Sequence, residues 1–257
     1  MNDLVQDRPA SGTPDSAFNI AGRATPAGNG LEWWTKAWPL FTGQIGMWIA
    51  MIVVAFIVFA VASLIPVIGP IASMLLWPVV AGGLMLGARD VDRGGALSFA
   101  HLTAGFSAGA GQLILVGVAY LVGMIVAGGI AMLVAGVGIG TMMMGASGGG
   151  NPTAMGAAGA ASILLAVLIA VALLVPVYMA TWFAPALIAL QGIGAVDAMK
   201  ASFFGCLKNI VPFLVYGLVG MLLAIVAAIP FGLGWLVLGP VTVVSVYVGY
   251  RDIYLGS

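Results

Sequence analysis

Six long apolar stretches alternate with short polar or turn-rich segments along this chain of 257 residues. Each stretch has about the 20 apolar residues that a helix needs to cross the roughly 30 Å hydrocarbon core of a bilayer. The pattern predicts an all-α, polytopic membrane protein with six transmembrane helices. We expect the spans at about residues 45–65, 71–88, 113–136, 162–182, 210–229 and 233–250.

A shorter amphipathic segment precedes the first, third and fifth spans. Large apolar residues recur there at helical spacing, and charged or polar residues lie on other faces. Such helices lie at the membrane interface, where aromatic rings and long basic side chains favour the headgroup level. His101 is expected to point away from the apolar face as a solvated side chain. The side chains expected at the interface or against lipid are Trp34, Trp38, Lys36, Phe99, His101, Phe106, Lys200, Phe203 and Lys208.

The same unit of interfacial helix, span, turn and span occurs three times. Pro66 and Pro230 open matching uncharged turns, and an Arg-Asp pair follows the returning span in both units. The middle unit is a looser copy with a longer outer loop. Because each unit has two spans, the copies have the same orientation and form a parallel internal repeat. The pairs Arg89-Asp90 and Arg251-Asp252 are expected to stop the helices that precede them.

Two segments lack the pattern of a span. Residues 1–30 are rich in Pro, Gly, Ser, Asn and Asp, so we expect a disordered cytoplasmic tail before a membrane domain at 31–257. Residues 137–161 are mostly Gly, Ala and Met, and are expected to form a long flexible loop. The methionines of that loop suggest a Cu(I) relay as one hypothesis, but methionine also fills gaps between helices.

The composition of the chain argues against several other classes of protein. The chain is 62% hydrophobic and 6% charged, with mean hydropathy +1.17, whereas ordinary soluble domains carry about 25% charged residues. Net charge is zero without a clustered basic face, so no nucleic-acid partner is expected. Cys206 is the single cysteine, which excludes an intramolecular disulfide and a cysteine metal cluster.

No enzymatic site is evident. The expected spans contain no Asp, Glu, Lys, Arg or His, which are the residues that usually mark function inside a membrane. We therefore expect no catalytic residue, no cofactor and no metal. Small residues such as Gly83 with Gly87, and Gly136 with Gly140, are expected to allow close helix packing. The prolines Pro78, Pro176 and Pro240 should bend spans, and the carbonyls that they free could line a cavity.

One stretch resembles the signature of a set of bacterial membrane proteins. It combines a Phe-Ala-Pro run, a Gln-Gly pair and a helix that ends in Lys-Asn. This set includes a membrane domain fused to some glycerophosphodiester phosphodiesterases, and residues 31–254 most resemble an uncharacterised six-span proteobacterial family. The resemblance implies a fold and the bacterial inner membrane, but no catalytic residue, because Gln191 stands where many relatives carry an acid and no phosphodiesterase domain is attached. The motif residues are Phe183, Pro185, Gly192 and Asn209.

Two kinds of function remain open. The first is a non-enzymatic membrane protein that organises lipid or partner proteins at the cytoplasmic face, which three interfacial helices favour. The second is a transporter or permease for an apolar or lipid-like solute, which the proline-bent spans favour. Membrane lipids are the expected partners, with another protein or a second copy of the chain as further candidates.

The distribution of basic residues predicts the orientation. All eight Lys and Arg residues lie on the side of the two termini, and cytoplasmic loops are the ones that hold such residues. A reporter fused after Ser147 should therefore be active in the periplasm, and alkaline phosphatase activity measures this. A cytoplasmic reporter at that position would contradict the topology.

Overall fold

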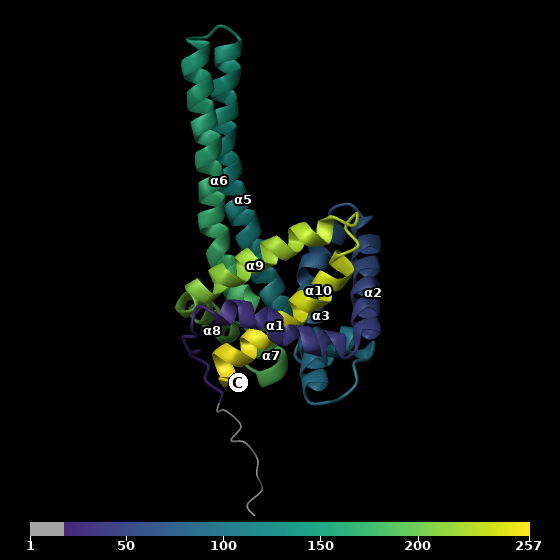
Figure 1. Ribbon diagram of the computed structural model, residues 1–257. Coiled ribbons are helices and arrows are strands. Elements are labelled where there is room, and N and C mark those ends of the chain that lie inside the picture. The colour runs from purple at the N-terminus through teal and green to yellow at the C-terminus, as the bar shows by residue number, and fades with distance from the viewer. Residues whose placement is uncertain (1–17) are drawn as a thin grey trace, which may run out of the picture.

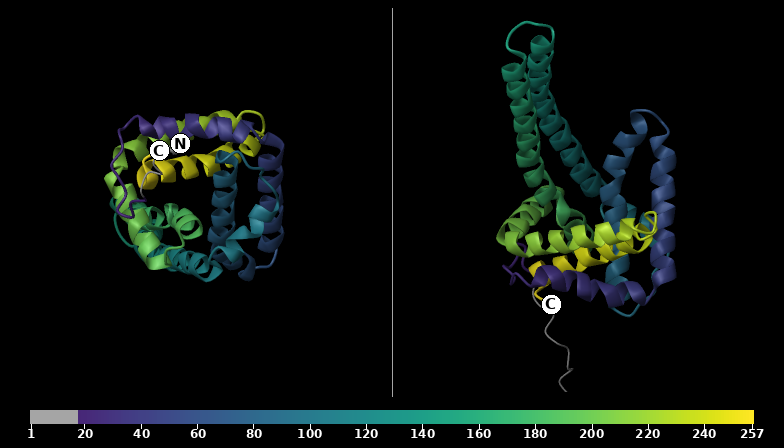
Figure 2. Two further views of the ribbon diagram at one scale, coloured as in Figure 1. Left: turned by 90° about the horizontal axis from the view of Figure 1, so that it is seen from below. Right: turned by 45° about the horizontal axis from the view of Figure 1, so that its top comes forward.

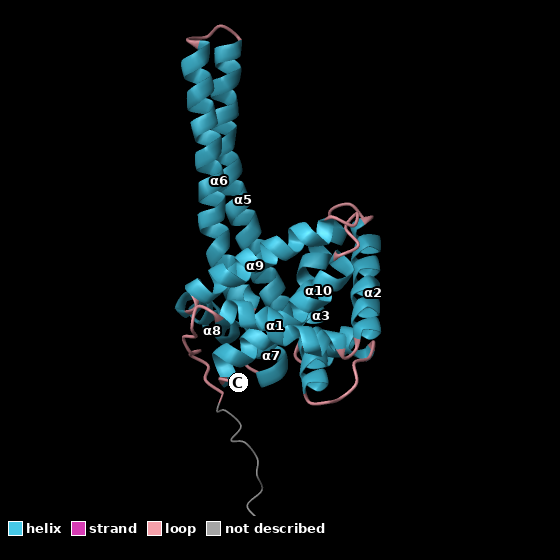
Figure 3. Cartoon of the chain, in the orientation of Figure 1, coloured by secondary structure: helices cyan, strands magenta, loops and turns pink. Residues whose placement is uncertain are grey.

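The computed structural model describes residues 18–257, and this part of the chain is helical without strands (Figures 1 and 3). Ten α-helices are followed by one π-helical segment, η1. Their bounds are α1 Asn29–Thr42, α2 Ile45–Ser63, α3 Ile68–Asp92, α4 Ala100–Ser107, α5 Ala110–Ala146, α6 Pro152–Trp182, α7 Ala184–Gln191, α8 Ala195–Lys208, α9 Ile210–Ala228, α10 Trp235–Tyr250 and η1 Arg251–Leu255.

Six segments are long and apolar enough to cross a membrane, which confirms the predicted number of spans and the polytopic all-α class. They form three hairpins, α2–α3, α5–α6 and α9–α10. The short helices α1, α4, α7 and α8 lie together at one end of the molecule and form what we term the short-helix layer (Figures 1 and 2). The six segments are Ile45–Ser63, Ile68–Asp92, Ala110–Ala146, Pro152–Gln191, Ile210–Ala228 and Trp235–Leu255.

The predicted loop at residues 137–161 is wrong. α5 continues to Ala146 and α6 begins at Pro152, so only a short turn joins them. Ala and Met favour helix, and Asn151 caps α6 by accepting hydrogen bonds from the backbone N–H groups of Thr153 and Ala154. The 37 residues of α5 extend about 55 Å at 1.5 Å per residue, and the hairpin projects beyond the other two in Figure 1.

The short helices close the three units into a ring. Three of them pack mainly against the hairpin of the preceding unit: α4 against α3, α8 against α6, and α1 against α9 and α10, while α7 packs mainly against α3. Since α1 belongs to the first unit and α9–α10 to the last, the order is cyclic. Figure 2, seen from below, shows α1 lying along the hairpin that ends the chain. The repeat found in the sequence is thus also a repeat of packing contacts.

Two of these helix–helix contacts are so close that only glycine fits in them. A methyl group on Gly105 of α4 would overlap the carbonyl oxygen of Val79 in α3, and one on Gly30 of α1 would overlap that of Pro212 in α9. Gly83 and Gly87 also lie against α4 or the segment before it, as their predicted packing role requires. Gly136 and Gly140 face open space in α5, so the same prediction is wrong for them.

Each unit has an amide side chain at the start of its first span, and this side chain binds a backbone N–H of the following unit. Leu97 N–H donates to Oε1 of Gln44 at 2.7 Å, and Ala195 N–H donates to Oε1 of Gln112 at 2.7 Å. Thr25 N–H donates to Oδ1 of Asn209 at 2.8 Å, which connects the last unit to the first. In all three places the donor lies at or just before the short helix of the following unit. We call these three contacts the amide clamps.

The prediction of a disordered tail at residues 1–30 is wrong for its second half. Residues 1–17 lie outside the described residues. Residues 18–28 form an ordered strap along α8 and η1, and α1 begins at Asn29. Asn19 N–H donates to the carbonyl of Tyr254, and Lys208 Nζ donates to the carbonyl of Ala21 at 2.7 Å. The sequence did not predict this strap, because hydrogen bonds to backbone groups leave no pattern of apolar residues.

Replacement of Asn209 by Ala should open the ring at the strap. The fully buried Asn209 side chain also donates to the carbonyls of Arg23 and Gly205, so its loss leaves several buried backbone groups unpaired. We expect a loss of about 2–3 kcal/mol in the free energy of unfolding in detergent, together with faster tryptic cleavage at Arg23. As a control, Asn151→Ala removes only an exposed helix cap and should cost about 1 kcal/mol. Equal stability and cleavage for Asn209→Ala and the wild type would contradict the role of the clamp.

Candidate functional site

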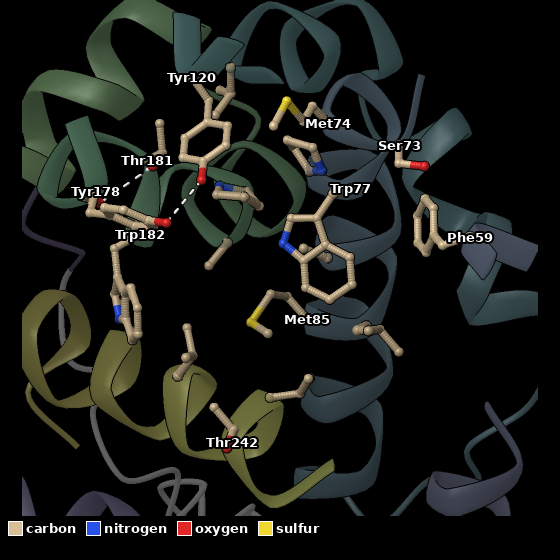
Figure 4. A pocket seen from close by; sticks show the side chains of 18 residues that line it. Phe59, Ser73, Met74, Trp77, Met85, Tyr120, Tyr178, Thr181, Trp182 and Thr242 are labelled. Carbon is tan, nitrogen blue, oxygen red and sulfur yellow. Dashed lines mark hydrogen bonds between the residues drawn. The ribbon is translucent and has the colours of Figure 1, made fainter. Parts of the chain in front are cut away.

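A cavity of about 520 Å³ lies between the three hairpins (Figure 4). Its volume is within the range of about 300–1,000 Å³ that small-molecule sites usually have. The walls come from α2, α3, α5, α6, α7 and α10, so every unit contributes. The lining residues are Phe59, Ser73, Met74, Trp77, Pro78, Ala81, Leu84, Met85, Val116, Tyr120, Tyr178, Thr181, Trp182, Pro185, Ala186, Thr242, Val243 and Val246.

The cavity has a closed floor and an open rim. Leu84, Val116 and Ala186 on its floor are buried, whereas Trp77 on α3 is 49% exposed and Tyr178 on α6 is 47% exposed. Both rim residues belong to segments that are apolar and long enough to cross the membrane. None of the lining residues comes from α1, α4 or α8. The mouth therefore opens among the spans, where lipid would surround it.

The polar groups of the cavity are few and uncharged. The hydroxyls of Tyr120 and Tyr178 are 2.9 Å apart and hydrogen-bonded, and Figure 4 shows both at one end of the cavity. Three other lining hydroxyls, on Ser73, Thr181 and Thr242, bond to carbonyls of their own helices. The lining includes no Asp, Glu, Lys, Arg or His. Such a site can select a ligand by shape, apolar contact and one or two hydrogen bonds.

Proline shapes two sides of this cavity, in line with one of the features noted in the sequence. Pro78 lies within α3 and has no N–H, so the carbonyl of Met74 lacks its usual helical donor. Pro185 is the second residue of α7, where a missing N–H costs nothing because that group has no partner inside the helix. Both prolines line the cavity, while Pro176 and Pro240 do not.

On α1, the structure separates the residues that were predicted to meet lipid. Trp34 is 6% exposed, stacks on Tyr216 of α9 at 4.7 Å between ring centroids, and donates to the carbonyl of Tyr216. Its prediction as a lipid contact is therefore wrong, since tertiary packing buries it. Trp38 is 52% exposed and Lys36 is exposed beside Glu32, to which it is bridged at 2.9 Å.

His101 does not point away into solvent, as the sequence suggested. Its side chain is 13% exposed, and Nε2 lies 3.2 Å from Oδ2 of Asp90 at the end of α3. The backbone N–H of Ser98 donates to Nδ1 at 3.1 Å. These contacts fix the imidazole between α3 and α4, while Phe99 and Phe106 stay exposed on α4.

α8 packs inward through small residues, and its larger apolar residues face outward. Ala198, Ser202 and Cys206 are buried, whereas Val196, Phe204 and Leu207 are exposed. Phe203 is half-buried and Lys200 is exposed, while Lys208 holds the strap. Sequence periodicity overlooked Phe204, because we expected the large residues to mark a single face and small residues carry little hydrophobic signal.

The two Arg-Asp pairs lie at or near the C-terminal ends of their α-helices, and each pair also contacts a neighbouring helix. α3 continues past Arg89-Asp90 to Asp92, and the chain stays helical through Arg251-Asp252 into η1. Asp252 accepts hydrogen bonds from Asn29 and Trp33 of α1, each at 2.8 Å. Arg251 pairs with Asp92, to which Tyr247 also donates. An acidic side chain near the end of a helix can accept hydrogen bonds from another unit. The spacing of residues along the chain does not predict such contacts.

The four motif residues of the resemblance have structural roles at helix junctions. Phe183 is buried at the junction of α6 and α7, and its N–H donates to Oγ of Ser202 at 2.9 Å. Pro185 is the second residue of α7, and Gly192 directly follows its last residue with a φ of 69°, a left-handed conformation that suits glycine. Asn209 is one of the amide clamps. Together they position α7 beneath the cavity and join α8 to α6.

Apart from the hint given by proline, the sequence did not predict the cavity. Tyr120 and Tyr178 place polar groups in otherwise apolar spans, but so do other tyrosines, such as Tyr216. Two phenol groups far apart in sequence do not indicate a site until the fold places them together. Among the predicted outer methionines, Met142 and Met155 fill gaps beside glycines of the opposite helix, as gap-filling residues do.

Comparison with known proteins identifies a relative among bacterial membrane proteins. A probable inner membrane protein of Burkholderia thailandensis is 31% identical over 212 residues, which cover 80% of this chain and 77% of the relative. No protein-family model matches the chain. No solved structure matches it either. The identity and coverage, with the six apolar segments, identify a multi-pass protein of the inner membrane.

Cys206 should resist thiol reagents. It is 4% exposed, its Sγ lies 3.6 Å from the carbonyl of Met179, and burial raises the pKa of the thiol to about 12. A raised pKa keeps the thiol neutral below that pH, so little reactive thiolate forms at pH 7–9. We expect maleimide labelling at pH 8 to be at least tenfold slower than for Val196→Cys, an exposed position on the same helix, in a Cys206→Ser background. Equal labelling rates would show that α8 does not pack as described.

Proposed function

We propose that this chain, which belongs to the family of the Burkholderia thailandensis probable inner membrane protein, binds an apolar, lipid-like molecule in the cavity between its three hairpins. The observation that carries the proposal is an uncharged cavity of about 520 Å³ whose mouth lies among the membrane spans. A molecule dissolved in the bilayer can enter such a mouth directly. A water-soluble ion or metabolite would find no charged partner inside.

Between the two functions left open by the sequence, this geometry favours the one that handles an apolar or lipid-like solute. Binding is the first step of transport, presentation to another protein, or storage of such a solute. We infer that the protein is not an enzyme, because the residues lining the cavity include no Asp, Glu, Lys, Arg, His or Cys that could activate a hydroxyl or act in its place. The short-helix layer and both termini are proposed to face the cytoplasm, since the basic residues lie there.

A role in organising lipids or partner proteins at the cytoplasmic face is the second candidate. It is supported by exposed large apolar side chains on three of the short helices, namely Trp38, Phe99, Phe106, Phe204 and Leu207. Lys36 and Lys200 lie beside them and suit anionic headgroups. A relationship to phosphodiesterase-associated membrane domains remains a prediction from the motif at residues 183–209. The two roles are compatible, because the interfacial helices seat the protein while the cavity binds the solute.

Filling the cavity tests the proposal. Ala81 lines it from α3, and Ala81→Phe should displace the bound molecule while leaving the outer surfaces unchanged. The matched control is Ala172→Phe, which places the same ring on an exposed face of α6. Both variants and the wild type would be purified in native nanodiscs, and their lipids quantified by mass spectrometry. We expect at least one molecular species to fall fivefold or more in Ala81→Phe alone, and identical lipid profiles in all three would contradict the proposal.

A further inference from the structure

We infer that the ligand of the cavity is an uncharged amphiphile whose polar end carries a hydrogen-bond acceptor, such as an ester or carbonyl oxygen, bound by the tyrosine pair Tyr120–Tyr178. The inference rests on the proposed function and adds the chemical class of the ligand. It follows from the hydrogen-bonding state of each polar group that lines the cavity.

The tyrosine pair has one proton more than its internal contact uses. The hydroxyls are 2.9 Å apart, and their rings meet edge to face with centroids 5.6 Å apart. One hydroxyl donates to the other, so the second O–H is left without an acceptor among the described residues. A donor without a partner is costly in an apolar environment, and an oxygen from a ligand would relieve that cost.

The remaining hydroxyls of the cavity cannot take this role. Ser73 donates to the carbonyl of Gly69 at 2.8 Å, Thr181 to that of Val177 at 3.0 Å, and Thr242 to that of Leu238 at 2.7 Å. Each of these protons is already bonded to the backbone of its own helix. The unused hydroxyl donor of the cavity is therefore at the tyrosine pair.

Trp77 supplies a second donor on the opposite wall. Its indole N–H has no hydrogen-bond partner in the part of the chain that the structure describes, and Figure 4 shows the nitrogen facing the space between Trp77 and Tyr178. The indole N–H of Trp182, which also lines the cavity, likewise has no partner among the described residues, so all of these unused groups carry protons to donate. A ligand that fits them presents oxygen acceptors, and a pure hydrocarbon would leave them unpaired.

Charge restricts the ligand further. The lining holds no Lys, Arg or His, so an anionic headgroup inside the cavity would lose its hydration without gaining a counter-charge. An uncharged ester, ketone or glyceride avoids that cost. The remaining surface of the cavity is apolar and contacts the hydrocarbon part.

The experiment compares two labelled probes of similar size, methyl oleate and the hydrocarbon heptadecene, on the full chain in detergent. The test variant is Tyr120→Phe with Tyr178→Phe, which keeps both rings and removes both hydroxyls. We expect it to bind methyl oleate about fivefold more weakly than the wild type and to bind heptadecene unchanged. The control Thr141→Val removes a hydroxyl that bonds to its own helix outside the cavity, and should leave both affinities unchanged. Sodium oleate, as the anionic probe, should compete less well than methyl oleate.

The outcomes separate a failure of the proposed cavity function from a failure of the role given to the tyrosine pair. If Ala81→Phe abolishes binding of both probes but the double Phe variant matches the wild type, the cavity binds lipid and the role of the tyrosine pair is wrong. If the double variant weakens both probes equally, the hydroxyl pair is only structural, and the inference is overturned. If Ala81→Phe leaves binding of both probes unchanged, the proposed function fails together with the inference.

Discussion

The structure depends on the pairing of backbone groups at the points where a short helix enters the next unit. A backbone N–H that leaves water needs a partner, and near a bilayer the cost of an unpaired one is several kcal/mol. Gln44, Gln112 and Asn209 provide that partner at three equivalent junctions. Because the third clamp reaches back to Thr25, it links the end of the chain to its beginning. The three units therefore form a closed ring and not a row.

Ring closure explains where the cavity lies. The short helices α1, α4 and α8 each pack mainly on the hairpin of the preceding unit, so the hairpins are held apart by their connections and meet around a common space. α7 and the buried residues Leu84 and Val116 close the space toward the short-helix layer, and the rim residues leave it open among the spans. The polar residues outside the cavity mainly hold helices together, as Asp252 does with α1. Inside it, the tyrosine pair and the indole N–H of Trp77 are left with protons to donate.

Much of the architecture could be predicted from the sequence, because apolar length and the position of charge follow directly from the bilayer. The six spans and the threefold repeat belong to this class. What failed depended on contacts between distant segments: Trp34 was expected at lipid but stacks on Tyr216, and His101 was expected in solvent but lies beside Asp90. The inner face of α8 is built from small residues, which hydrophobic patterns underweight. The cavity needs six helices at once, so neither Tyr120 nor Tyr178 alone could indicate it.

The central claim is that the ring of three units encloses a site for a lipid-like molecule inside the membrane. An experimental structure of the full chain in native-lipid nanodiscs, determined with a bound antibody fragment to aid alignment, tests it most directly. The account predicts elongated non-protein density between Trp77 and the tyrosine pair, with its polar end at the phenol oxygens of Tyr120 and Tyr178. A cavity closed by side chains, with α10 packed directly against α5 and α6, would contradict it.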